Sequence, residues 1–275
     1  MRSTISLDVL ALSLLALAPV GAAGQPRRVE PLPALAPLLD STGFHGTVLI
    51  YDLRRDRLQA THTEFVDARR IPASTFKIVN AMIALETGIV ADDHAVVRWD
   101  SVVRPRAELN RDLDLATAFR LSAVPHFQSL ARAIGPGRMQ HFIDTLQYGN
   151  RDISGGIDQF WLTGGLRVSP REQIQLLVRL YRNELPVSAR TMATVKHIME
   201  GESAAGITVR GKTGWAILPS GHEVGWWVGW VERGTDVYFF ASMIEGDHPG
   251  ASFAAARTSI CRGVLRQLGI LPPAG

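Results

Sequence analysis

The chain of 275 residues is 46% hydrophobic and 20% charged, so it can bury a sizeable core and is neither a disordered tail nor a fibrous protein. Its 29 basic and 26 acidic residues are scattered, with no cationic block and no basic patch interleaved with aromatic residues. We therefore expect no nucleic-acid partner.

Residues 1–24 have the pattern of a secretory signal peptide. Arg2 precedes an apolar stretch at 9–18, and small residues at 21–23 offer a cleavage site. Asp8 departs from this pattern, and the alternative is an uncleaved membrane anchor, although the apolar stretch is too short to span a bilayer comfortably. We expect an exported, periplasmic protein whose residues 25–275 form a single domain.

Strand patterns open and close this domain, and helical patterns fill its middle. Residues 46–52 and 57–61 predict an antiparallel hairpin around a charged turn. Residues 223–230 and 237–244 predict a second, strongly apolar hairpin, which is followed by a closing helix at 253–268. Helical spacing recurs at 72–87, 113–121, 127–134, 137–146, 170–183 and 188–199.

This order predicts a mixed α/β (α+β) fold, in which an antiparallel β-sheet flanked by helices is joined to a helical lobe. The chain ends would meet on the sheet, and a ligand would bind in a cleft between sheet and helices. Trp226 and Trp230 are predicted to share one sheet face opposite Trp227, and burial explains that pattern. Cys261, the single cysteine, cannot form an internal disulfide and is interpreted as a packed residue of the closing helix.

Signatures of several other enzyme classes are absent. The eight histidines include no H-E-x-x-H and no close pair beside a carboxylate at metal-ligand spacing, so we expect neither a metal nor another cofactor. The G-x-S-x-G elbow of the α/β-hydrolases does not occur either.

A serine and a lysine three residues apart are the first candidates for chemistry. Pro72 suits the first turn of a helix, so Ser74 would lie near the positive end of the helix dipole. The predicted helix is apolar on nearly every face, and Lys77 is the one ionisable residue between 71 and 85. Burial lowers the pKa of such an amine and would make it a base beside the Ser74 hydroxyl. The alternative is an ordinary helix whose lysine extends into solvent.

Two later tripeptides extend this motif. The sequence S-A-V at 122–124 follows a helical stretch and is stopped by Pro125, which would present a hydroxyl group from a loop. The sequence K-T-G at 212–214 is predicted at the start of a strand, where glycine lets the backbone of a substrate approach closely. In this order the three motifs resemble those of the active-site serine penicillin-recognising enzymes, whose signature is S-x-x-K, S-x-N or S-x-V, and K-T-G.

Further motifs narrow the resemblance. With valine at 124, Y-G-N at 148–150, F-W-L at 160–162 and G-W-W-V-G-W at 225–230, the chain is similar to the class D, oxacillinase-type β-lactamases from about residue 45 to its C-terminus. The resemblance implies a β-lactamase/transpeptidase-like fold and one catalytic domain over 25–275. It also implies hydrolysis of penicillins and related β-lactams, an activity that confers antibiotic resistance.

Roles for individual residues follow from the resemblance. Ser74 would form the acyl-enzyme, and Lys77, carboxylated by carbon dioxide to a carbamate, would be the general base for both half-reactions. Ser122 would relay a proton to the leaving nitrogen, and Trp161 would donate a hydrogen bond to the carbamate. The carbamate pocket would be walled by Phe76, Val124 and Leu162.

The resemblance also implies how the substrate is held. Backbone N–H groups of Ser74 and Trp215 would form the oxyanion hole. A cationic site would bind the substrate carboxylate. Its members would be Lys212, Thr213, Gly214 and Arg257, with Arg262 and Arg266 as alternatives to Arg257.

Two other functions share these motifs, namely a cell-wall D,D-peptidase or transpeptidase and a non-catalytic β-lactam sensor domain. A monomer and a homodimer are equally compatible with the sequence. Val79 and His126 depart from residues common in the family. The segment 215–223 is predicted to join the two strands that border the site, and it does not reveal the substrate range.

Overall fold

The computed structural model describes residues 28–273, so the expected signal peptide at 1–24 lies outside the described residues. A seven-stranded sheet is the centre of the fold, with the strand order β1-β3-β2-β9-β8-β7-β6. Its strands are β1 (Val29–Pro31), β2 (His45–Asp52), β3 (Arg57–Ala60), β6 (Glu200–Ala204), β7 (Ile207–Ile217), β8 (His222–Arg233) and β9 (Asp236–Asp247). Neighbouring strands are antiparallel except that β1 runs parallel to β3.

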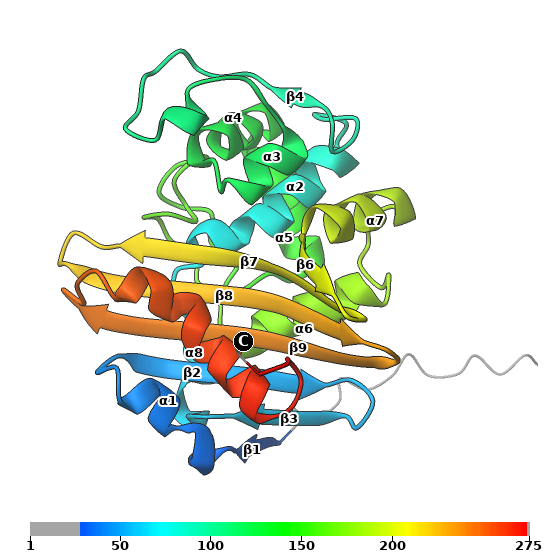
Figure 1. The fold of residues 1–275 in the computed structure, drawn as a ribbon. Coiled ribbons are helices and arrows are strands. Elements are labelled where there is room, and N and C mark those ends of the chain that lie inside the picture. Colours follow the sequence, from blue (N-terminus) through cyan, green and yellow to red (C-terminus); the bar gives the residue numbers. More distant parts are fainter. Residues whose placement is uncertain (1–27, 274–275) are drawn as a thin grey trace, which may run out of the picture.

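Helices cover the sheet on both faces. Figure 1 shows α8 and α1 in front of the sheet, α6 behind it, and α2, α3 and α4 gathered beyond the β7 edge. The α-helices are α1 (Pro37–Asp40), α2 (Lys77–Glu86), α3 (Leu115–Arg120), α4 (Val124–Ile134), α5 (Pro136–Leu146), α6 (Pro170–Tyr181), α7 (Ala189–Ile198) and α8 (Phe253–Gln267). Short 3-10 helices are η1 (Pro33–Leu35), η2 (Thr63–Phe65), η3 (Ala73–Phe76) and η4 (Ala107–Leu109), and β4 (Val96–Val97) pairs with β5 (Leu113–Asp114).

Successive side chains of the central strands point to opposite faces of the sheet, and each face packs in its own hydrophobic core. Along β2, Leu49 packs in the core beneath α2 and α6, whereas Ile50 packs in the core beneath α8. A strand buried on both faces in this way reads as a continuous apolar run. Trp226 and Trp230 lie in the first core and Trp227 in the second, which confirms the predicted faces.

The fold class predicted from the sequence is confirmed, and both predicted hairpins form. Cys261 is fully buried in α8, and burial raises the pKa of its thiol. No helix within residues 28–273 is both long and apolar enough to cross a membrane.

Two predictions about the strands near the site were wrong. K-T-G at 212–214 lies in the second half of β7 and not at the start of a strand. The first half of β7 is only partly buried and has a short apolar alternation of Ile207 and Val209, and its partner β6 is exposed throughout, so neither gives a strong strand pattern. Trp215 still pairs with β8, and the connection that was predicted over 215–223 is reduced to residues 218–221.

Two helix starts also differ from the prediction. Helix α4 begins at Val124, three residues before the predicted start, because Pro125 occupies its first turn, where a missing N–H is tolerated. The helix predicted at 72–87 begins as the 3-10 turn η3 and becomes α-helical at Lys77.

Candidate active site

Ser74 and Lys77 meet at the junction of η3 and α2. Nζ of Lys77 donates a hydrogen bond of 2.7 Å to Oγ of Ser74, and the lysine side chain is fully buried. Burial, with smaller contributions from the positive charges of Lys212 and Arg106, holds the pKa of Lys77 well below its ordinary value. The amine is therefore suited to accept the proton of the serine hydroxyl.

Aromatic rings surround this lysine. Phe76 is fully buried and stacks on Trp161 with ring centroids 5.2 Å apart. Nζ of Lys77 lies 5.5 Å from the ring centroid of Phe127, a residue that the sequence analysis did not single out. Val124 and Leu162 are partly buried at the start of α4 and beside Trp161. The pocket around the amine is thus predominantly apolar.

Trp161 is held by a compact loop between α5 and α6. Asn150 closes the loop, because its Nδ2 donates to O of Gly165 at 2.9 Å and its Oδ1 accepts from N of Arg167 at 2.8 Å. Gly149 has φ +56°, and a Cβ there would lie 2.1 Å from O of Arg167. The Y-G-N motif therefore brings the two ends of this loop together.

The indole of Trp161 has a polar atom without a partner. The side chain is fully buried, and its Nε1 has no hydrogen-bond acceptor among residues 28–273. An unsatisfied buried donor costs about 1–3 kcal/mol, so such a group in a native structure calls for an explanation.

Ser122 faces the same cleft from the turn between α3 and α4. Its φ of 53° lies in the left-handed region, which costs a non-glycine residue free energy and is frequent at functional sites. Nζ of Lys212 donates to Oγ of Ser122 at 3.0 Å and to O of Thr213 at 3.1 Å. Burial, together with the charges of Arg257 and Arg106, lowers the pKa of Lys212 to about 7.

Gly214 lets β7 approach the turn that carries Ser74. A Cβ on Gly214 would lie 2.8 Å from O of Pro72 and 3.1 Å from Cγ2 of Thr75. Any larger residue would push the strand away from the serine. From the sequence, this glycine was expected to admit the substrate backbone, whereas in the structure the backbone that lies against it is that of the serine turn.

Arg257 reaches the cleft from α8. Its Nη1 lies 3.3 Å from O of Gly214, to which it donates, and its guanidinium lies 4.7 Å from the ring centroid of Trp215. Gly225 leaves room for this side chain, since a Cβ there would lie 2.6 Å from Cγ of Arg257. The two alternatives lie elsewhere, because Arg262 pairs with Glu202 and Arg266 is exposed in the last turn of α8.

The segment 98–112, between β4 and β5, contacts the turn before Ser122 and the first part of α4. Arg106 in this segment donates to O of Leu121 at 3.1 Å, directly before Ser122. His126 is buried, and its Nε2 lies 2.9 Å from O of Arg111 in the same segment. The sequence analysis missed Arg106, because no motif surrounds it.

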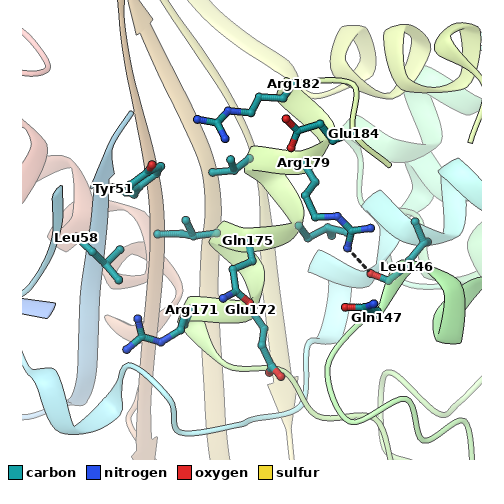
Figure 2. Close-up of a pocket in the computed structure, with 13 residues that line it drawn as sticks. Tyr51, Leu58, Leu146, Gln147, Arg171, Glu172, Gln175, Arg179, Arg182 and Glu184 are labelled. Carbon is teal, nitrogen blue, oxygen red and sulfur yellow. Dashed lines mark hydrogen bonds between the residues drawn. The ribbon is translucent and has the colours of Figure 1, made fainter. Parts of the chain in front are cut away.

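A separate cavity of about 570 Å³ lies around the exposed side of α6 and contains none of the motif residues. Figure 2 shows Arg179 pointing to the carbonyl of Leu146, to which it donates at 2.8 Å, and Arg182 on the other side of the helix. Arg171 in its lining pairs with Asp67. Among residues 28–273, no three His, Cys, Asp or Glu side chains are placed to hold a metal ion.

Comparisons with known proteins agree with this geometry. The family model of the penicillin binding protein transpeptidase domain matches residues 45–266. The chain is 42% identical over 229 residues to β-lactamase OXA-48 of Klebsiella pneumoniae, covering 82% of this chain and 84% of that protein. A solved class D β-lactamase from Nostoc has a TM-score of 0.82 and 40% identity, covering 86% of this chain and 99% of that chain. The regulatory protein BlaR1 of Bacillus licheniformis is 33% identical over 85% of this chain and 38% of its own length.

Proposed function

This chain belongs to the class D serine β-lactamases, and we propose that it hydrolyses β-lactams through an acyl-enzyme on Ser74, with Lys77 in its carboxylated form as the general base. One observation carries the proposal. Lys77 is fully buried 2.7 Å from Ser74, while the indole N–H of Trp161, in the same aromatic cluster, has no acceptor among the described residues.

The surroundings of Lys77 fit carboxylation. Carbon dioxide reacts with a neutral amine, and the lowered pKa of Lys77 favours that form. The product is an anion, which the same positive charges that disfavour the ammonium, those of Lys212 and Arg106, would stabilise. Its oxygens need donors, and the unpartnered N–H of Trp161 is available. Carboxylation supplies an oxygen base in place of a nitrogen base.

In acylation, Lys77 would take the proton from Oγ of Ser74 as the oxygen attacks the lactam carbonyl carbon. The carbonyl oxygen becomes negative and would accept from the backbone N–H groups of Ser74 and Trp215. Collapse of this intermediate breaks the lactam C–N bond, and Ser122 would relay the proton from Lys77 to the leaving nitrogen, which returns the base to its unprotonated form. The bond from Lys212 to Ser122 would lower the cost of that transfer, since it orients the hydroxyl group.

In deacylation, Lys77 would take a proton from water as the water oxygen attacks the ester carbonyl, and it would return the proton to Oγ of Ser74 as the ester bond breaks. The ring carboxylate of the substrate would be bound by Lys212, Thr213 and Arg257. Arg257 has its guanidinium at the β7 edge, where it donates to O of Gly214 and lies against the ring of Trp215.

Intact-mass measurement after mixing with benzylpenicillin tests hydrolysis. We expect a single adduct on Ser74 that disappears within the time needed for substrate turnover. An adduct that persists for hours would overturn hydrolysis and favour the sensor or the peptidase.

Labelled bicarbonate tests whether the general base is the carboxylated form of Lys77. After incubation with ¹³C-bicarbonate, the wild-type protein should show one carbamate carbon resonance that Lys77→Ala lacks, and bicarbonate should restore activity lost at acid pH. Protonation of the amine explains that loss, since an ammonium cannot react with carbon dioxide. Activity that is indifferent to bicarbonate, with no carbamate resonance, would refute the carboxylated base.

A further inference from the structure

Arg106 extends a cationic side chain beside Leu121, and the proposed reaction assigns it no contact with the substrate. Its Nη2 donates to O of Leu121 at 3.1 Å, and its Nε donates to Glu108 at 2.9 Å. The side chain is 53% exposed, so a ligand can reach it. The buried His126 contacts the backbone of the same segment at Arg111 and helps to hold it over the cleft.

The positive charge in the cleft is not balanced by the protein. Lys212 donates to Ser122 and to a main-chain carbonyl, and Arg257 donates to main-chain carbonyls. Within residues 28–273 neither of them has a carboxylate partner. Arg106 is close enough to lower the pKa of both Lys77 and Lys212, and Glu108 is its one carboxylate partner in the described part of the chain.

These cations reach the Ser122 turn through different contacts, since Lys212 binds the Ser122 hydroxyl and Arg106 binds the carbonyl of Leu121. Lys212 and Arg257 belong to the β7 side, where the ring carboxylate would bind, whereas Arg106 lies on the side of Leu121 and the segment 98–112. A substrate with a second negative charge on its acyl side chain could thus meet a separate cation. Glu108 pairs with Arg106 and therefore competes with the substrate's second anionic group for its guanidinium.

We propose that Arg106 is a specificity-determining residue that favours β-lactams carrying an additional anionic group, such as a carboxylate, on the acyl side chain. This inference rests on the proposed β-lactam acylation. A partly exposed charge-assisted contact of this kind corresponds to a rate ratio of about five- to tenfold.

The test compares benzylpenicillin with α-carboxybenzylpenicillin, which differ by one carboxylate on the acyl side chain. The readout is the second-order acylation rate constant of α-carboxybenzylpenicillin divided by that of benzylpenicillin, both measured by intact mass at low salt. Arg106→Gln should lower this ratio about five- to tenfold, because it removes the cation that attracts the second carboxylate. Arg106→Lys should lower the ratio less. Glu108→Gln should raise it, because the competing carboxylate is gone.

Arg98→Gln is the matched control, because Arg98 lies in the same segment and pairs with Asp112 at the surface. Its ratio should equal that of the wild type. If Arg106→Gln slows both substrates by the same factor, Arg106 merely holds the segment against Leu121 and the proposal is overturned. A protein that is acylated without turnover would refute hydrolysis, yet the acylation ratio would still decide the role of Arg106.

Discussion

Trp161 combines a fully buried ring with an N–H group that has no acceptor within residues 28–273. Trp161→Phe keeps most of the stacking on Phe76 and removes the donor. We expect the carbamate resonance to weaken and kcat to fall by about 100-fold or more, as for loss of one donor to a catalytic anion. Saturating bicarbonate should restore part of that activity, which steady-state kinetics with and without bicarbonate would measure.

Trp230→Phe provides the control for this substitution. Trp230 is also fully buried, but its Nε1 already has a partner, since it donates to Glu232 at 2.9 Å. Its replacement should leave the carbamate resonance unchanged. If Trp161→Phe retains the full resonance and wild-type kcat, the indole N–H has no role in holding the base.

The residues that could be predicted from the sequence are those fixed by local spacing. Ser74 and Lys77 meet because residues three apart share a helix face, whether the turn is 3-10 or α-helical. Arg106 and Phe127 could not be predicted, because tertiary packing of a loop and of a second helix brings them to the cleft. Neither side chain belongs to a periodic or motif pattern that marks such a contact.

At the scale of elements, the loop between α5 and α6 depends on Asn150. Asn150→Ala removes the hydrogen bonds to Gly165 and Arg167 and should destabilise the protein by about 1–3 kcal/mol. Since this loop carries Trp161, we also expect activity to become more dependent on added bicarbonate. Chemical denaturation and bicarbonate titration of kcat would measure the two effects.

Asn110→Ala is the matched control for Asn150→Ala. Asn110 closes the segment 98–112 with the same chemistry, accepting from N of Arg104 and donating to O of Arg104, both at 2.9 Å. It should destabilise the protein without weakening the hold on Trp161. Equal bicarbonate dependence in the two variants would contradict a specific role for Asn150.

Strands with a regular pattern of hydrophobic residues could be predicted, and strands without such a pattern could not. Strands β8 and β9 are buried along most of their length and were found, although each extends beyond its predicted ends. Strand β7 alternates in burial, but its inward positions include Lys212 and Gly214, which serve the site and carry no hydrophobic signal. A functional strand is thus harder to recognise than a structural one.

At the scale of the whole molecule, the antiparallel sheet flanked by helices and joined to a helical lobe could be predicted from the chain order, but the ion pairs and hydrogen bonds between these parts could not. Arg70 lies in the segment that leads to Ser74 and forms a bidentate ion pair with Glu245 of β9, 175 residues away in the chain. Arg70 also pairs through its backbone with Val168, just before α6. This one residue therefore connects the sheet to the segment that carries the nucleophile and to the loop that ends before α6.

The ion pair predicts a pH-dependent stability. Burial acts to raise the pKa of Glu245, but the hydrogen bonds and charge of Arg70, with a smaller contribution from His222, lower it below its ordinary value. A carboxyl group whose pKa is lowered by folding stabilises the native state above its unfolded pKa, and that contribution is lost as the pH falls through the folded pKa. Arg70→Gln should therefore lower the free energy of unfolding by about 1–3 kcal/mol at pH 7, and the difference should shrink below about pH 4.

Urea denaturation at several pH values would measure this difference, with Arg57→Gln as the control. Arg57 pairs with Glu30 at the edge of the sheet, where both side chains are 47% exposed, so its loss should have little effect on the free energy of unfolding. Since Arg70 anchors the segment before Ser74, its replacement should also slow acylation by benzylpenicillin, whereas Arg57→Gln should not. A constant difference in stability from pH 7 to pH 3 would show that Glu245 contributes through packing and not through its charge.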